Sequence, residues 1–136
     1  MHSTNYFNSL ITVAADCKVS RGTIPKVNPE KLSIANYHFQ QINNHPLALQ
    51  SDEVLFNTHV LRKDITSSEI AAERANFFSK GQACLRTSPL TKTYGWGIYF
   101  DAKGRVKLVD SASEEYLQLI EDKTIKKIPA MRSSKK

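Results

Sequence analysis

The chain has 136 residues, of which 40% are hydrophobic and 24% are charged, a composition typical of one globular domain. This composition excludes general disorder, and two cysteines, Cys17 and Cys84, are too few for a disulfide framework. The apolar run near the N-terminus is too short for a signal peptide or a membrane span. We therefore expect a cytoplasmic protein.

The net charge of +6 is concentrated near the C-terminus. Residues 1–122 carry 13 basic and 13 acidic side chains, whereas the remaining residues carry six basic side chains and no acidic one. We expect residues 1–128 to form a single globular domain and residues 129–136 to form a basic flexible tail. Such a tail can strengthen binding to a phosphate backbone, so nucleic acid is a weaker alternative partner. A solvated end is the more frequent role of such a tail.

The first predicted elements are a strand and a helix. Residues 9–15 (SLITVAA) form an apolar run before a loop, which predicts a short buried strand. A helix is expected to begin near Pro29 and to stop before Pro46, because proline suits the first helical turn and the residue before a proline avoids the helical region. Four apolar residues at helical spacing would form its buried face: Leu32, Ala35, Phe39 and Ile42.

Two further helices are predicted in the central part of the chain. The first should begin at Ser51, a suitable N-cap. Thr66 and Glu69 have the spacing of a capping box and predict the start of the next helix, which Gly81 would end with a left-handed C-cap. In the helix that begins at Ser51, Leu55, Thr58 and Arg62 mark one side, and Val54 and Leu61 mark the other.

The last predicted elements are a hairpin and a helix. Residues 96–100 and 105–109 flank a short loop with Gly104 where a positive φ is required, which predicts a β-hairpin. A final helix is expected from about Ser111. The order of elements indicates an α+β fold, in which the N-terminal strand and the C-terminal hairpin form a small, mainly antiparallel sheet with three to four helices.

No cofactor or metal is expected from the motifs. The four histidines are scattered, and the chain has no paired C-x-x-C motif that would indicate zinc. The sequence also lacks a dinucleotide-binding fingerprint and a phosphate-binding P-loop. The surroundings of Ser88 match no serine nucleophile motif.

The segment 82–97, between the third helix and the hairpin, is the best candidate for a binding site, because linkers held between two regular elements often carry function. Arg86 suits a carboxylate or phosphate, and aromatic rings can stack on a ligand. The predicted ligand-binding residues are Arg86, Ser88, Lys92, Tyr94 and Trp96. The structural alternative is that Arg86 pairs with a carboxylate of the third helix, that Trp96 belongs to the core, and that Cys84 is a buried small residue.

These residues favour a small cytoplasmic protein that binds an anionic or aromatic small molecule. An alternative is an enzyme with Cys84 or Ser88 as nucleophile, for which Asp101 or His59 would be the base. The sequence identifies no catalytic residue and indicates neither an oligomeric state nor a membrane partner.

Several segments also resemble a known family. They are MHSTNY at the start, SIAN at 33–36, SDEVLF at 51–56, ERANFFSKGQACLRTSPLTKTYGWGIY at 73–99 and AMRSSK at 130–135. These segments resemble a family of small uncharacterised microbial and fungal proteins, a domain of unknown function. The resemblance spans nearly the whole chain. It implies a single stand-alone cytoplasmic domain and supplies no activity, substrate or cofactor.

Overall fold

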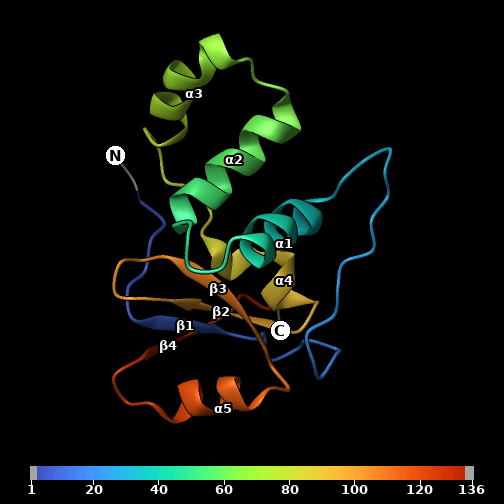
Figure 1. The fold of residues 1–136 in the computed structure, drawn as a ribbon, viewed down its shortest axis with the longest axis vertical. Helices are drawn as coiled ribbons and strands as arrows, with labels where there is room; N and C mark the ends of the chain where they lie inside the picture. The colour runs from blue at the N-terminus through green and yellow to red at the C-terminus, as the bar shows by residue number, and fades with distance from the viewer. Residues whose placement is uncertain (1–2, 134–136) are drawn as a thin grey trace.

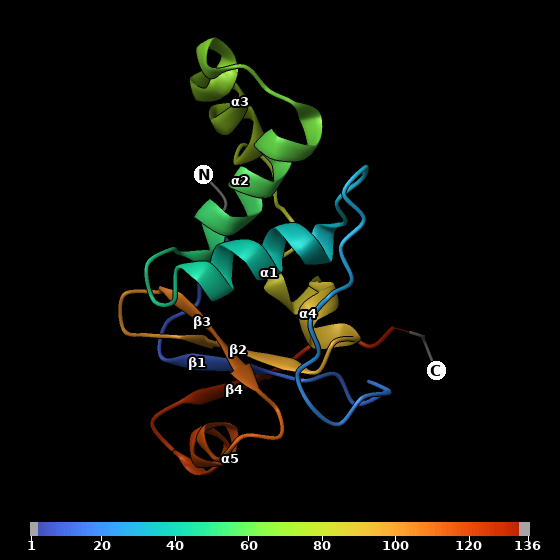
Figure 2. The ribbon, with the colours of Figure 1, turned by 45° about the vertical axis from the view of Figure 1, so that its right-hand side comes forward.

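A computed structural model describes residues 3–133 and contains a four-stranded sheet with helices on both faces (Figures 1 and 2). The order of strands in the sheet is β3-β2-β1-β4. Their bounds are Ser9–Thr12 for β1, Trp96–Phe100 for β2, Val106–Asp110 for β3 and Lys126–Pro129 for β4. The predicted α+β class, with a small and mainly antiparallel sheet that includes the N-terminal strand, is confirmed.

The N-terminal strand β1 lies inside the sheet. It pairs with β2 in antiparallel fashion, with Leu10 opposite Tyr99, and with β4 in parallel fashion, with Leu10 opposite Lys127. The predicted hairpin of β2 and β3 is confirmed, and Gly104 in its loop has a φ of +80°. The sheet is therefore mixed, because β4 adds one parallel pair to two antiparallel pairs.

Within residues 3–133, five α-helices and two short 3₁₀ helices accompany the sheet. The α-helices are α1 (Ile34–Asn44), α2 (Ser51–Lys63), α3 (Ile70–Phe77), α4 (Pro89–Lys92) and α5 (Glu114–Glu121), and the 3₁₀ helices are η1 (Ser67–Glu69) and η2 (Leu85–Thr87). Helices α1 and α4 cover one face of the sheet, while α5 lies on the other and α3 projects away from it (Figure 2). None of these helices is long and apolar enough to cross a membrane.

The starts of α1, α2 and α5 differ from the predicted ones. Helix α1 begins after Ser33 and not near Pro29, because the Ser33 hydroxyl accepts a hydrogen bond from the backbone amide of Asn36 at 3.1 Å. Helix α2 is capped by Gln50, so the predicted N-cap Ser51 is its first helical residue. The N-cap of α5 is Ser113, two residues after the predicted start.

The end of α3 also differs from the prediction. The helix stops at Phe77, and Gly81 does not adopt the left-handed conformation expected of a C-cap. The side-chain amide of Gln82 instead donates a hydrogen bond of 2.7 Å to the carbonyl of Phe77. This bond satisfies one of the carbonyl groups that a helix leaves unpaired at its C-terminus.

The predicted boundary between domain and tail falls inside β4. Pro129 lies opposite Thr12, and the amide of Ala130 donates to the Thr12 carbonyl at 3.0 Å. The amide of Met131 donates to the Arg86 carbonyl at 2.9 Å, and Ala130 is buried. Lysine and proline suit an edge strand, because they discourage pairing with another chain. Residues 134–136 of the predicted tail lie outside the described residues.

Candidate functional site

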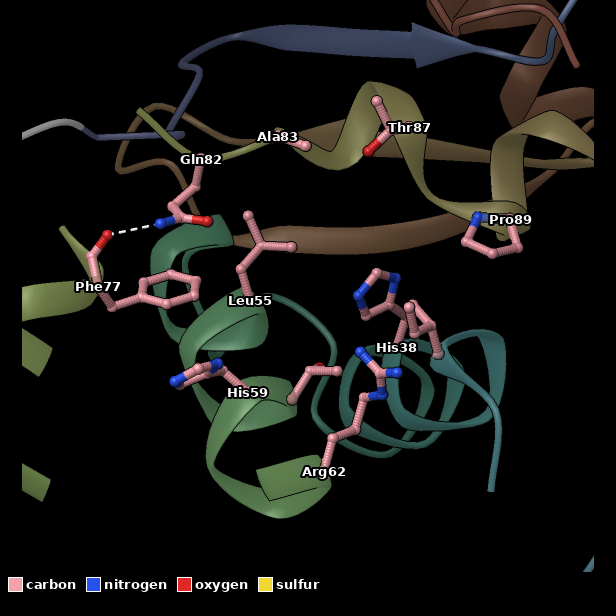
Figure 3. Close-up of a pocket in the computed structure, with 11 residues that line it drawn as sticks. His38, Leu55, His59, Arg62, Phe77, Gln82, Ala83, Thr87 and Pro89 are labelled. Atoms are coloured by element: carbon pink, nitrogen blue, oxygen red, sulfur yellow. Dashed lines mark hydrogen bonds between the residues drawn. The ribbon is translucent and has the colours of Figure 1, made fainter. Parts of the chain in front are cut away.

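A cavity of about 420 Å³ lies between α1, α2 and residues 82–89 (Figure 3). We call it the His38–Arg62 cavity. Its polar lining residues are His38, Thr58, His59, Arg62, Gln82 and Thr87. Its apolar lining residues are Ile34, Leu55, Phe77, Ala83 and Pro89. Polar groups that converge on an apolar pocket of this size are typical of small-molecule sites.

Helical spacing explains why these side chains share one cavity. His38 follows Ala35 by three residues and precedes Ile42 by four, so the three side chains share the buried face of α1. On α2, the side predicted from the spacing of its residues faces the cavity, and this side comprises Leu55, Thr58 and Arg62. Short connections within residues 82–89 then close the cavity toward the sheet (Figure 3).

His38 and Ser88 form a buried polar pair beside this cavity. His38 Nδ1 lies 2.8 Å from Ser88 Oγ, and the two residues are only 4% and 2% exposed. Burial lowers the pKa of His38 from 6.5 to about 4. The imidazole is therefore neutral at pH 7, because the low-dielectric surroundings disfavour its charged form.

The hydrogen bonds of Ser88 determine the tautomer of His38. Ser88 Oγ already accepts a hydrogen bond from the Leu90 amide at 3.3 Å. Among the described residues, His38 Nδ1 is the only acceptor for the Ser88 hydroxyl proton, which would otherwise be buried without a partner. We therefore assign the donor role to Ser88 and the proton of the neutral imidazole to Nε2. Figure 3 shows one nitrogen of the ring turned toward the interior of the cavity.

Two further basic side chains of α2 line the cavity. His59 stacks near Phe77, with ring centroids 4.9 Å apart, and its Nε2 lies 3.7 Å from a carboxylate oxygen of Glu73. Arg62 is exposed and extends along the cavity toward His38 (Figure 3). Among residues 3–133, the Arg62 guanidinium forms no hydrogen bond or ion pair. Its charge is thus available to a ligand.

The predicted site residues point in different directions. Of the five, Ser88 contacts the cavity indirectly, through His38. The Arg86 side chain donates a hydrogen bond of 2.7 Å to the carbonyl of Pro129 instead of pairing with a carboxylate of α3. Lys92 lies in a separate surface depression that it shares with Asp16. A ligand-binding role for Arg86 and Lys92 stays a prediction, and the structure does not bring these two residues together with His38.

The two predicted aromatic residues pack between the sheet and the loop before α1. Trp96 donates from Nε1 to the carbonyl of Thr23 at 2.8 Å, and its ring lies 5.8 Å from that of Phe39. The Tyr94 carbonyl accepts from the amide of Thr23 at 2.7 Å, and its side chain packs against the core. These contacts give both residues a structural role, and neither lines the cavity.

Of the alternative catalytic residues, Cys84 and Asp101 do not line the cavity, whereas the candidate base His59 does. Cys84 Sγ lies 3.4 Å from the hydroxyl of Tyr6. Burial and this contact raise the pKa of Tyr6 to about 12, so Tyr6 is protonated at pH 7. Burial raises the pKa of Asp101, but hydrogen bonds from the amides of Arg105 and Lys103 lower it by more, so the pKa lies below its usual value. Asp101 thus supports the hairpin loop as a carboxylate.

Residues 1–136 match DUF6157, a family of unknown function. The protein belongs to DUF6157. The resemblance of its segments to a domain of unknown function is confirmed over the whole chain. Neither the curated proteins nor the solved structures yielded a match for this DUF6157 member.

Proposed function

We propose that the protein binds a small anionic molecule in the His38–Arg62 cavity. The observation that carries this proposal is that two donor groups of the cavity have no protein partner among residues 3–133: the Arg62 guanidinium and the His38 Nε2–H. Four residues of the predicted linker 82–97 line the cavity, and all four lie in its first half: Gln82, Ala83, Thr87 and Pro89. A guanidinium beside a buried donor is suited to an anion.

Binding is favoured over nucleophilic catalysis by the positions of the two candidate nucleophiles. A nucleophile must reach the substrate. The Ser88 hydroxyl is buried behind His38, and the Cys84 thiol contacts Tyr6, so neither group lines the cavity. In this proposal Ser88 is a positioning residue that holds His38 in one tautomer.

We also propose that the protein is cytoplasmic. Cys17 and Cys84 are both free thiols, which suits a reducing compartment such as the cytoplasm. Nucleic acid is the weaker alternative partner. It would use the basic residues that follow residue 122, two of which, Lys126 and Lys127, lie in the edge strand β4.

The test is a thermal-shift screen of carboxylates, phosphates and nucleotides on the wild-type protein and on Arg62→Met. A ligand that binds only the folded state raises the melting temperature by mass action. We expect at least one anion to raise it in the wild type and to have no effect on Arg62→Met. Without ligand, Arg62→Met should change stability by no more than about 0.5 kcal/mol, as for other exposed side chains.

Lys63→Met is the matched control, because Lys63 is an exposed neighbour that does not line the cavity and its loss changes the net charge equally. The control should respond to the ligand like the wild type. Equal loss of response in both variants would indicate non-specific attraction to positive charge and would contradict the proposed site. A screen in which no anion raises the melting temperature would overturn the proposed function.

A further inference from the structure

Building on the proposed function, we infer that the ligand of the His38–Arg62 cavity is a monocarboxylate whose apolar body carries a hydrogen-bond donor, such as a hydroxyl or N–H group. The inference comes from the charge of the cavity, from the direction of its hydrogen bonds and from the placement of its apolar lining.

Within the described part of the chain, the cavity offers one uncompensated positive charge. Arg62 supplies it, since a guanidinium is always protonated. His38 adds none at pH 7, because its pKa is about 4. His59 faces the Glu73 carboxylate at 3.7 Å, so a proton on His59 would be balanced by that carboxylate. One net charge suits a carboxylate better than the dianion of a phosphate monoester.

The hydrogen-bond acceptors of the cavity lie apart from Arg62 and His38. Gln82 uses one of its two amide N–H groups to bond the Phe77 carbonyl, which leaves its carbonyl oxygen as an acceptor and its second N–H as a donor. The Thr87 hydroxyl donates to the Cys84 carbonyl at 2.8 Å, which leaves its oxygen as a second acceptor. Among the described residues, Arg62 and His38 are the donors at one end of the cavity, and they match the two oxygens of a carboxylate.

The apolar lining lies between these two sets of polar groups. Leu55 lies in the middle of the close-up, with Arg62 and His38 to one side and Gln82 and Phe77 to the other (Figure 3). A carboxylate held by Arg62 would therefore extend an apolar or aromatic body over Leu55 toward Phe77. A donor at the far end of that body would reach the Gln82 carbonyl oxygen.

The test is isothermal titration calorimetry at pH 7.5 with four related probes: para-hydroxyphenylacetate, phenylacetate, phenylacetamide and phenyl phosphate. Phenyl phosphate is mostly a dianion at this pH, because the second pKa of a phosphate monoester is about 6. We expect the hydroxylated acid to bind more tightly than phenylacetate. The uncharged amide should bind at least about tenfold more weakly than phenylacetate, because it loses a charge-assisted hydrogen bond. Phenyl phosphate should also bind at least about tenfold more weakly, because a single guanidinium leaves its second negative charge without a partner.

Gln82→Met tests the acceptor, because it keeps the length of the side chain and removes the carbonyl oxygen, together with the amide that bonds the Phe77 carbonyl. In this variant the ratio of the affinities for the hydroxylated acid and phenylacetate should fall to about one, because the ratio cancels any loss that both acids share. A preference that persists in Gln82→Met would overturn the assigned acceptor.

Two other outcomes would overturn the inferred ligand class. One is that phenyl phosphate or phenylacetamide binds as tightly as phenylacetate. The other is that none of the four probes binds. Neither outcome overturns the proposed function, which depends on the broader screen and on the Arg62→Met variant. If phenyl phosphate were the tightest probe and required Arg62, the cavity would be an anion site of a different class.

Discussion

His38 is a neutral imidazole inside the protein, with a proton donor on one side and an open cavity on the other. Its neutral form is maintained by burial, and its tautomer is maintained by the Ser88 hydroxyl. The other basic side chains in the cavity lining are His59 and Arg62, both from α2. Protonation of His38 would therefore place a second positive charge in the same space as Arg62.

The lowered pKa of His38 makes stability depend on pH. Between its unfolded pKa of 6.5 and its folded pKa of about 4, the unfolded chain binds a proton that the folded protein does not. The contribution of neutral His38 to the free energy of unfolding is therefore fully present above pH 6.5 and is lost as the pH falls toward 4. The full difference corresponds to about 3 kcal/mol, at 1.36 kcal/mol for each pKa unit.

Urea denaturation at pH 7 and at pH 4.5 would measure this loss. Carboxylates also titrate in the acid range, so the control is His38→Gln, whose amide oxygen can still accept from Ser88. We expect the wild type to lose about 2 kcal/mol more than His38→Gln between the two pH values, as part of the full linkage effect. Equal losses in the two proteins would mean that His38 titrates normally in the folded state.

At the scale of elements, the contact between β2 and α5 depends on a glycine. A Cβ atom on Gly97 would lie 2.7 Å from the ring of Tyr116. The ring cannot move away freely, because the Tyr116 hydroxyl accepts a hydrogen bond of 3.1 Å from the Val13 amide. Burial also raises the pKa of Tyr116, which keeps this hydroxyl protonated. Gly97 thus lets α5 approach the sheet.

Gly97→Ala should therefore destabilise the protein by about 1–3 kcal/mol, the usual cost of overpacking a core contact. Gly81→Ala is the matched control, because a Cβ there has no neighbour within 4 Å and the backbone is not left-handed. The control should be neutral or slightly stabilising. Urea midpoints of the two variants give the comparison, and similar midpoints would show that Tyr116 adjusts without cost.

Elements with local signals could be predicted from the sequence. The hairpin was found because Gly104 marks its turn, and the end of α1 because Pro46 stops a helix. Helix α4 also has a local signal, since Ser88 is its N-cap and Pro89 its first residue, although the predicted linker 82–97 includes this pair without a helix. Strand β4 could not be recognised, because its partner Ser9–Thr12 is distant in the sequence and its lysines resemble a tail.

The candidate site was harder to predict for a related reason. Its lining comes from α1, α2, the last residue of α3 and the linker, and packing alone brings these together. The side of α2 with Leu55 and Arg62 was identified from spacing, yet nothing local relates it to His38. His38 itself could have been noticed, because it occupies a position on the apolar face of α1. A histidine on such a face is either paired in the core or directed at a cavity, and here it is both.

At the scale of the whole molecule, the residues after β4 form hydrogen bonds with β1 and with η2. Removing residues 129–136 would delete the hydrogen bonds from Ala130 to Thr12, from Met131 to Arg86 and from Arg86 to Pro129. At about 0.5–1.5 kcal/mol for each bond, this truncation should cost about 2–4 kcal/mol. Differential scanning calorimetry would measure the change in melting temperature.

Removing residues 134–136 alone is the control, because this shorter truncation keeps all three hydrogen bonds. It should leave the melting temperature within a few degrees of the wild type, as usual for chain ends. If the longer truncation melts at the same temperature as the shorter one, residues 129–133 contribute nothing to stability, and the separable tail begins at residue 129 as the charge pattern predicts.

The parallel pair of β1 and β4 also has a consequence for protein synthesis. Ribosomes make β1 early and β4 only after most of the chain, so one side of β1 emerges long before its partner exists. An unpaired strand edge can pair with neighbouring chains, and distant contacts form slowly. While it is being translated, the nascent chain therefore presents an open edge to its surroundings, and the sheet closes only when Lys126–Pro129 has emerged.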